Sequence, residues 1–374
     1  MCAVSGTLDL PRSPLVSAIS DSKPRSTHSA GQAGEEEQTM AAQKHPLSKL
    51  GLVLIGRNEG ERLRLGLESV PEGVGGVVYV DSGSTDGSVE LAESHGVAVV
   101  NLDMSRPFTA ARARNEGFER LMHLHDNLDW VHFVDGDCSL VEGWIETAMG
   151  ELTAHPDWIS VCGYRRERYP ENSIYNRWCD LEWTQAPTGP IDQVGFGGDV
   201  IISVPAFREV GGYNADIIAA EDSELSARLV QTGGEVMRID RTMTYHDADI
   251  RKLSQWWSRS VRCGHAYAEV ASRHAEAGVF RRHVRSLVLW GVAIPAATLF
   301  FLLVAPLLAL LFLGVYPLQI VRIARSLDTQ RFPLSHRLLW GVSCLVSQVP
   351  KVQGLLKFVR NRRSGVQQTI IEYK

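Results

Sequence analysis

The sequence predicts an α/β domain with a Rossmann-like, mainly parallel sheet flanked by helices, followed by membrane-associated helices. Three observations support this expectation. Strand-like and helix-like runs alternate between residues 47 and 280. Acidic residues directly follow several strand-like runs. Residues 286–321 form one long apolar stretch without a charged side chain. Strands that alternate with helices favour right-handed crossovers and parallel pairing.

The alternation can be followed element by element. Helix-like runs cover residues 58–70, 89–96 and 109–124, and strand-like runs cover residues 50–56, 76–81, 97–102 and 130–137. In sheets of this kind, ligands bind at the carboxyl ends of the strands. Asp81 and the pair Asp135 and Asp137 follow strand-like runs, so a binding site is expected there.

Composition narrows the possible functions. The net charge of −5 gives no reason to expect nucleic acid as a partner. The cysteines are scattered without a C-x-x-C pair, which argues against a structural zinc site. Residues 1–46 are rich in small and polar side chains and are expected to be disordered. Met40 offers an alternative start of translation.

The turn after the first strand excludes two nucleotide-binding classes. A dinucleotide-binding domain would need G-x-G-x-x-G at this point. The chain has Gly56-Arg57-Asn58-Glu59-Gly60 instead, which is also not a Walker loop. Binding of NAD and hydrolysis of ATP therefore lose their main support.

Charged residues gather in five places along the chain. Each place alone could be a turn, a solvated helix face or an acidic helix start. Their occurrence in one fixed order favours a single site instead. The five places are Glu59, Asp81, the pair Arg112 and Arg114, the pair Asp135 and Asp137, and the pair Glu221 and Asp222.

This order resembles the family 2 glycosyltransferases, which are inverting enzymes of the GT-A fold that use nucleotide-sugar donors. The resemblance covers about residues 49–250, and the C-terminal segments look like those of bacterial membrane-associated members. The motifs that carry it are GRNEGERLRLGLESV, VVYVDSGSTDGSVELAESHG, ARARNEG, VDGDCSL, GGDVIISVPAFREVGGYN and EDSELSARL.

The resemblance implies a divalent metal, Mn²⁺ or Mg²⁺, that neutralises the diphosphate leaving group. Asp137 would be a metal ligand, and Asp135 would contact the metal, its water shell or the ribose. His246 looks like a third ligand and would favour Mn²⁺, although a purely structural histidine is an equal alternative.

The same resemblance implies roles for the other residues. Asp81 and Glu59 would hold the nucleoside, and Arg112 or Arg114 would face the phosphates. The donor-sugar pocket would be lined by Gly197, Gly198 and Asp199.

One carboxylate must deprotonate the acceptor in an inverting transfer. Asp222 is the expected base, with Glu221 as the weaker candidate.

One stretch departs from the family pattern. Processive polysaccharide synthases carry Gln-x-x-Arg-Trp after the base, whereas this chain has QWWSRSVRCGHAY. Arg259 and Arg262 could still reach the diphosphate, and Trp256 and Trp257 could stack on an acceptor. Packing of this stretch as an amphipathic helix is at least as favoured, so polymer synthesis is not expected.

The apolar stretch is longer than the roughly 20 residues that one membrane span needs. Arginines on both sides of residues 286–321 favour a helical hairpin bent near Ala305 and Pro306, with one long tilted span as the alternative. Residues 336–363 are amphipathic and basic and suit an interfacial helix, or a further packed helix.

These expectations combine into one hypothesis. The protein would be a membrane-attached glycosyltransferase whose catalytic domain, residues 47–280, faces the cytoplasm and whose membrane-associated region is residues 281–374. It would use a UDP- or GDP-sugar and a lipid-linked or glycan acceptor. The alternatives are a nucleotidyltransferase of similar fold, which would need a basic Gly-rich first loop, and a non-catalytic scaffold.

Overall fold

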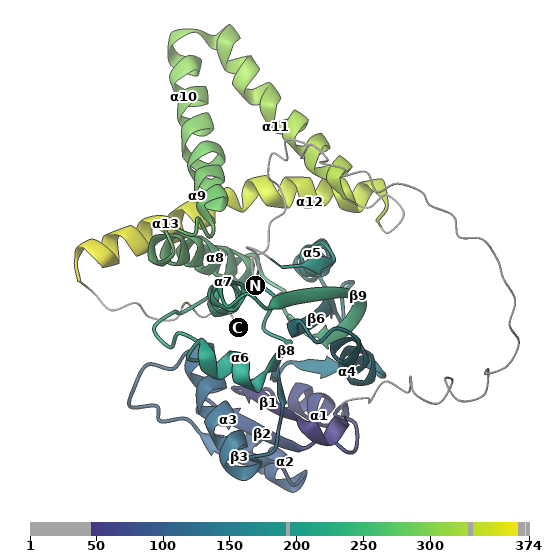
Figure 1. Ribbon diagram of the computed structural model, residues 1–374. Coiled ribbons are helices and arrows are strands. Elements are labelled where there is room, and N and C mark those ends of the chain that lie inside the picture. Colours follow the sequence, from purple (N-terminus) through teal and green to yellow (C-terminus); the bar gives the residue numbers. More distant parts are fainter. Residues whose placement is uncertain (1–45, 192–194, 328–331, 366–370, 372–374) are drawn as a thin grey trace, which may run out of the picture.

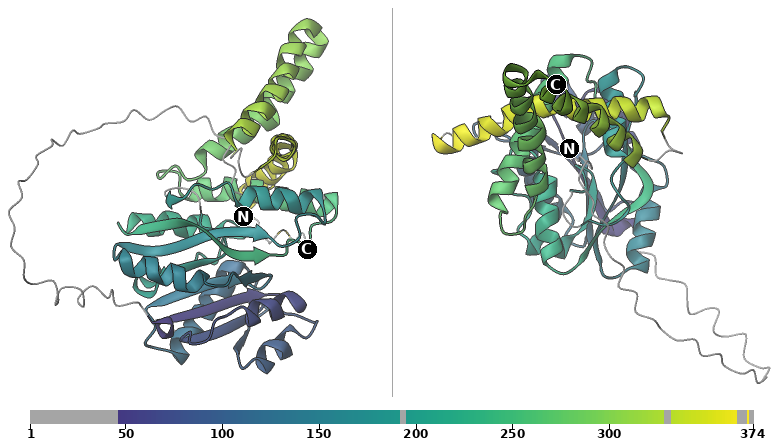
Figure 2. Two further views of the ribbon diagram at one scale, coloured as in Figure 1. Left: turned by 90° about the vertical axis from the view of Figure 1, so that its right-hand side faces the viewer. Right: turned by 90° about the horizontal axis from the view of Figure 1, so that it is seen from above.

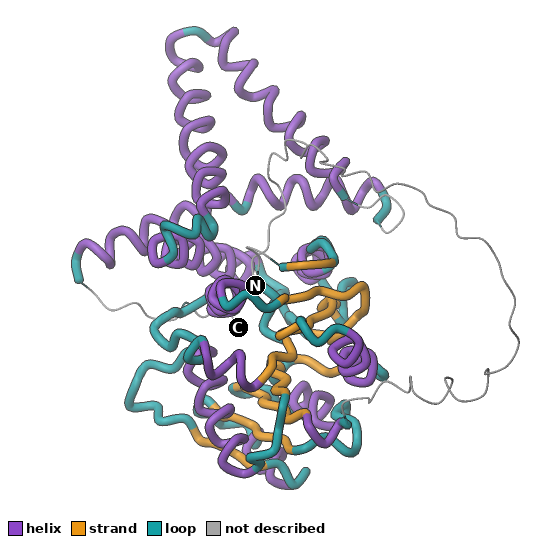
Figure 3. Tube along the Cα trace, in the orientation of Figure 1, coloured by secondary structure: helices purple, strands orange, loops and turns teal. Residues whose placement is uncertain are grey.

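The computed structural model describes residues 46–191, 195–327, 332–365 and 371 (Figure 1). The expectation of disorder for residues 1–46 falls almost entirely outside these described residues. The described chain forms one α/β domain with helices that project from it, and Figure 3 shows the strands gathered between helices. The predicted fold class, an α/β sheet flanked by helices, is confirmed.

The central sheet has a parallel half and a mixed half. In spatial order its strands are β3 (Ala98–Asn101), β2 (Gly76–Asp81), β1 (Leu50–Gly56), β4 (Trp130–Asp135), β8 (Val200–Ser203), β6 (Trp158–Glu167), β9 (Glu235–His246) and β5 (Cys138–Leu140). The short strand β7 (Gly189–Pro190) also pairs with β9. Strands β1 to β4 pair in parallel, whereas β8 lies antiparallel to both β4 and β6.

The strand register brings the acidic residues to one edge. Gly56 pairs with Asp81, and Ile55 pairs with Asp135, so these strands end together. In the mixed half, His246 pairs with Cys138 on one side and Glu167 on the other. His246 is thereby placed beside the turn that carries Asp137.

Helices cover the sheet and close the site. They are α1 (Glu61–Glu68), α2 (Ser88–Ser94), α3 (Ala110–Leu124), α4 (Trp144–Ala154), α5 (Ile174–Trp183), α6 (Val204–Glu209), α7 (Glu221–Gln231) and α8 (Leu253–Arg273). Helix α3 lies directly on β1 and β2, since a Cβ atom at Gly117 would lie 2.4 Å from Val53. This close approach fixes the helix that carries the two arginines.

The apolar stretch forms two helical arms rather than one. The first arm comprises α9 (Arg281–Val288), a π-helical turn (Leu289–Ala293) and α10 (Ile294–Val304). The second is α11 (Pro306–Ser326), and the chain reverses at Ala305. Phe301 and Phe312 stack across the arms with ring centroids 5.1 Å apart. Figures 1 and 2 show this hairpin standing away from the sheet.

Both arms are long and apolar enough to cross a membrane. Arg281–Val304 has a mean hydropathy of 2.4, and Pro306–Ser326 has 2.0. Their most apolar windows are only 11% and 22% buried, unlike the core helices of a soluble protein.

The expected interfacial helix 336–363 is divided into two helices. They are α12 (Leu334–Val346) and α13 (Gln348–Arg363), with Ser347 between them. Helix α13 packs on α8 with close backbone contact, because a Cβ atom at Gly264 would lie 1.9 Å from the Lys351 carbonyl oxygen. The alternative of a packed helix therefore describes α13 within this structure.

Candidate active site

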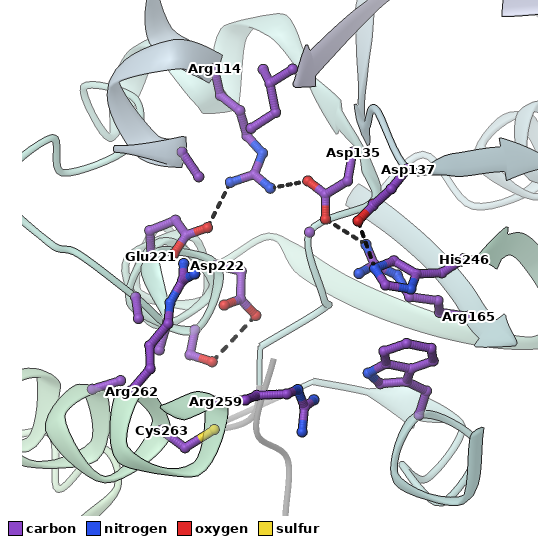
Figure 4. A pocket seen from close by; sticks show the side chains of 18 of the residues that line it. Arg114, Asp135, Asp137, Arg165, Glu221, Asp222, His246, Arg259, Arg262 and Cys263 are labelled. Atoms are coloured by element: carbon purple, nitrogen blue, oxygen red, sulfur yellow. Dashed lines mark hydrogen bonds and ion pairs between the residues drawn. The ribbon is translucent and has the colours of Figure 1, made fainter. Parts of the chain in front are cut away.

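A pocket of about 210 Å³ lies between the carboxyl edge of the sheet and helices α7 and α8 (Figure 4). The sheet side contributes Asp135, Asp137, Arg165 and His246 to its lining. The helical side contributes Glu221, Asp222, Arg259, Arg262 and Tyr267, together with Phe280 at the start of α9. Residues from distant parts of the chain thus surround one space.

Asp135, at the end of β4, is held by two arginines. Arg114 donates from Nη2 to its Oδ1 at 2.6 Å, and Arg165 donates from Nη2 to its Oδ2 at 3.0 Å. Burial raises the pKa of the Asp135 carboxyl, but the two guanidinium groups outweigh it and lower that pKa to about 2. Asp135 is therefore ionised at neutral pH.

Asp137 and His246 form the best candidate metal site. Asp137 Oδ2 lies 3.2 Å from His246 Nε2, and both side chains line the pocket. Potential ligand atoms of Asp137, His246 and the buried Cys138 lie within 4.8 Å of one another. A carboxylate and an imidazole form a donor set that suits Mn²⁺. The residues present therefore fit the divalent metal that the sequence predicts.

Glu221 and Asp222 open helix α7 but have different surroundings. Arg114 donates from Nη1 to Glu221 Oε1 at 2.7 Å, whereas Asp222 Oδ2 accepts from the backbone N–H of Gly197 at 3.2 Å. Burial acts to raise the pKa of Glu221, but Arg114 and Arg262 lower it. Burial and the neighbouring Glu221 raise the pKa of Asp222. Asp222 is consequently the better proton acceptor.

Two glycines allow the backbone to approach these carboxylates. A Cβ atom at Gly198 would lie 2.3 Å from Asp135 Oδ2. Gly197 has a φ of +95°, a conformation that favours glycine, and its N–H points to Asp222. Gly198 lines the main pocket, whereas Gly197 lines a smaller neighbouring cavity.

Some predicted donor residues lie outside the main pocket. Glu59 lines the pocket, whereas Asp81 is not among its lining residues. The Asp81 carboxylate instead accepts hydrogen bonds from Tyr79 Oη and from the backbone N–H groups of Gly83 and Ser84. These bonds stabilise the turn after β2. Asp199 lies behind Asp135, fully buried.

Of the two predicted arginines, the structure brings only Arg114 to the pocket. The Arg112 guanidinium binds Glu116 and the backbone oxygens of Asp103, Arg106 and Pro107. Positions two apart on a helix point to different faces, which separates these side chains.

Sequence reasoning missed Arg165, and it left open whether the tryptophans of α8 pack within the protein or stack on an acceptor. Arg165 lies within an otherwise buried stretch of β6, a pattern that could have marked it. Trp256 is buried against Cys179 and Ile250, and Trp257 donates from Nε1 to Gln353. The packing alternative therefore holds for both tryptophans. Arg259 and Arg262 do line the pocket.

Comparisons with known proteins agree with the predicted fold and family resemblance. Residues 53–207 match the family described as Glycosyl transferase family 2. The predicted resemblance to this family is thereby confirmed over the residues that the family model matches.

Two relatives illustrate the similarity. The pre-mycofactocin glycosyltransferase of Mycobacterium tuberculosis is 25% identical over 174 residues, which are 44% of this chain and 36% of that protein. The match thus spans about a third of that relative's length. The mannosyltransferase PcManGT of Pyrobaculum calidifontis, solved with GDP-Man and Mn²⁺, is 14% identical with a TM-score of 0.54. The similarity covers 86% of this chain and 89% of that one, and it shows the fold.

Proposed function

We propose that the protein is a metal-dependent, inverting glycosyltransferase that takes its sugar from a UDP- or GDP-sugar. One observation carries this proposal: Asp137 and His246 line the sheet side of a pocket whose other side holds Asp222. A nucleotide diphosphate and an acceptor hydroxyl could therefore meet between them. The mannosyltransferase of similar fold was solved with a nucleotide-sugar and Mn²⁺.

The reaction requires one proton transfer from the acceptor. Asp222 would remove the hydroxyl proton while the acceptor oxygen attacks the anomeric carbon. The bond from that carbon to the diphosphate oxygen breaks, and the nucleoside diphosphate leaves with the electron pair. A bound divalent cation offsets the negative charge on this leaving group. Asp137 and His246 would hold it, and Arg114 and Arg262 add positive charge around the same pocket.

The membrane is the proposed location of the acceptor. Phe280 lines the pocket and directly precedes α9, the helix with which the first arm begins. An acceptor that is lipid-linked, or a glycan held at the membrane surface, would be presented near Asp222. Arginines at both ends of the hairpin favour a cytoplasmic catalytic domain.

A panel of nucleotide-sugars tests the donor class. The full-length protein in detergent is mixed with UDP- and GDP-sugars with and without Mn²⁺, and its thermal midpoint and nucleotide release are measured. A matching donor should raise the midpoint only with metal. Release of pyrophosphate instead of nucleoside diphosphate would indicate a nucleotidyltransferase, and no stabilisation by any donor would contradict the proposal.

The anomeric configuration of the product tests the inverting mechanism. Once a donor and acceptor are found, NMR of the product should show the configuration opposite to that of the donor sugar. Retention of configuration would require a different role for Asp222.

A further inference from the structure

Arg165 occupies a position that joins three parts of the sheet. It lies on β6, and its side chain is 10% exposed. Its Nε donates to Asp199 Oδ2 at 3.1 Å, and its Nη2 lies 2.8 Å from Asp199 Oδ1. The same Nη2 donates to Asp135 Oδ2 at 3.0 Å. One guanidinium group therefore binds two carboxylates at once, and Figure 4 shows its contact with Asp135.

The carboxylate of Asp199 is buried and held in place by several hydrogen bonds. It is 0% exposed, and its Oδ1 accepts the backbone N–H of Asp135 at 3.0 Å. The Thr244 hydroxyl donates to its Oδ2 at 2.6 Å. A buried charge requires a charged partner and further hydrogen bonds, and Asp199 has both. It acts as a fixed support beneath Arg165.

The result for Asp135 is a carboxylate held from several sides. Arg114 binds Oδ1, Arg165 binds Oδ2, and a Cβ atom at Gly198 would lie 2.3 Å from Oδ2. A guanidinium group fixes direction through its planar donors, which an ammonium group does not. The orientation of Asp135 in the pocket therefore depends on Arg165.

We propose that Arg165, supported by Asp199, is a positioning residue that aims Asp135 at the nucleotide part of the donor. This inference rests on the proposed function, because it assigns a nucleotide to the space that Asp135 faces. Arg165 acts through Asp135 and not by contact with the nucleotide. The losses of nucleotide affinity caused by changing Arg165 and by changing Asp135 should therefore not add.

A double-mutant cycle on nucleotide affinity tests this dependence. Binding of UDP and GDP with Mn²⁺ is measured by calorimetry for wild type, Arg165→Met, Asp135→Asn and the double variant. Each single change should weaken binding by ~10–100-fold, the usual loss when a supporting partner is removed. The double variant should lose no more nucleotide affinity than the single variant that binds the nucleotide less tightly. Losses that multiply would mean that Arg165 contacts the nucleotide itself, and unchanged affinity in Arg165→Met would also overturn the inference.

Matched variants separate positioning from folding. Arg166 is the next residue on β6 and binds Asp180 with two nitrogens, outside the pocket. Arg166→Lys should leave nucleotide affinity unchanged, whereas Arg165→Lys should weaken it. If Arg165→Met fails to fold because Asp199 is left unpaired, Arg165→Met combined with Asp199→Asn removes both charges and should show the same loss. Full affinity in that folded variant would contradict the inference.

A result with wild type distinguishes the two proposals. If wild type binds neither UDP nor GDP in the presence of Mn²⁺, the proposed function fails. If wild type binds one of them and the cycle shows additive losses, only the role of Arg165 fails.

Discussion

Arg114 and Glu221 form a buried ion pair, with 2.7 Å between Nη1 and Oε1, that ties helix α3 to the first turn of α7. The other end of the same guanidinium binds Asp135 at 2.6 Å. Glu221 is thereby connected to the sheet edge, and its carboxylate is neutralised by a cation. The neighbouring Asp222 accepts from the Gly197 N–H and the Ser223 hydroxyl instead.

This difference predicts which carboxylate is the base. Asp222→Asn keeps the size of the side chain but cannot take a proton from the acceptor. Transfer should fall by ~10²–10⁴-fold, the usual contribution of a positioned general base. Affinity for the donor should be retained. The measurements are transfer rate and nucleotide affinity with the donor found in the panel.

Glu221→Gln provides the matched comparison. It removes the charge that faces Arg114 and leaves Asp222 in place, so it should reduce the rate less. A larger rate loss at Glu221 would reverse the assignment of the base. Loss of donor affinity in Asp222→Asn would mean that Asp222 holds the sugar.

The raised pKa of Asp222 predicts opposite effects on stability and activity. Its folded-state pKa lies above the unfolded value, so its contribution to the free energy of unfolding falls as the pH rises through the folded pKa. At neutral pH the buried charge destabilises the protein. Asp222→Asn should therefore raise the thermal midpoint while it lowers the rate. The gain should shrink when both proteins are compared at a pH below 3.8, the ordinary value of the carboxyl.

The pH dependence of the rate tests the Asp222 carboxyl in a second way. The base must be deprotonated, so kcat should fall as the pH drops through the raised pKa of Asp222. The residual rate of Asp222→Asn should lack this acidic limb. A limb that persists unchanged in that variant would point to another titrating group.

Sequence patterns predicted the parallel half of the sheet because its first three strands, β1, β2 and β3, are each followed by a helix. They also placed Asp135 and Asp137 correctly at the carboxyl edge. The mixed half depends on pairing between distant strands, such as β8 between β4 and β6, which local periodicity does not encode. The contact of Arg165 with Asp199 arises only from that pairing.

The choice between Arg112 and Arg114 shows a second limit of prediction from the sequence. Both lie on α3, and the motif alone does not say which face meets the pocket. The structure selects Arg114 because α3 rests on the sheet with Gly117 against Val53 and Val80. That packing contact fixes the rotation of the helix about its axis.

Removal of the Asp137 carboxylate should weaken metal binding. Asp137→Ala takes away the carboxylate nearest to His246 Nε2, so Mn²⁺ affinity should fall steeply, and transfer should fall with it. Binding is measured by electron paramagnetic resonance of free Mn²⁺. Cys138→Ala is the control and should keep Mn²⁺ affinity, since Mn²⁺ prefers oxygen and nitrogen donors to a thiol. Full transfer by Asp137→Ala, or by wild type in excess chelator, would contradict a metal-dependent reaction.

The hairpin geometry predicts the accessibility of three positions in intact cells or sealed vesicles. Single cysteines are introduced at His283, Ala305 and Ser326 in a chain whose native cysteines do not react with an impermeant maleimide. Positions 283 and 326 should be labelled only from the side of the catalytic domain, because 283 lies in α9, where the first arm begins, and 326 is the last residue of α11. Ala305 lies between two apolar arms and should be protected from that side. Labelling of 283 and 326 from opposite sides would require a single span.

The contact between α8 and α13 predicts a stability effect at one glycine. A Cβ atom at Gly264 would lie 1.9 Å from the Lys351 carbonyl oxygen and 2.5 Å from Lys351 Cα. These are backbone atoms of a packed helix, so relief requires the helices to move apart. Gly264→Ala should therefore destabilise the protein by about 1–3 kcal/mol, the usual cost of overpacking.

Gly314→Ala on α11 is the control, because a Cβ atom there meets nothing within 4 Å and alanine favours the helix. Thermal unfolding in one detergent should show a lower midpoint for Gly264→Ala and an equal or higher one for Gly314→Ala. Equal midpoints for wild type and Gly264→Ala would mean that α13 does not rest on α8.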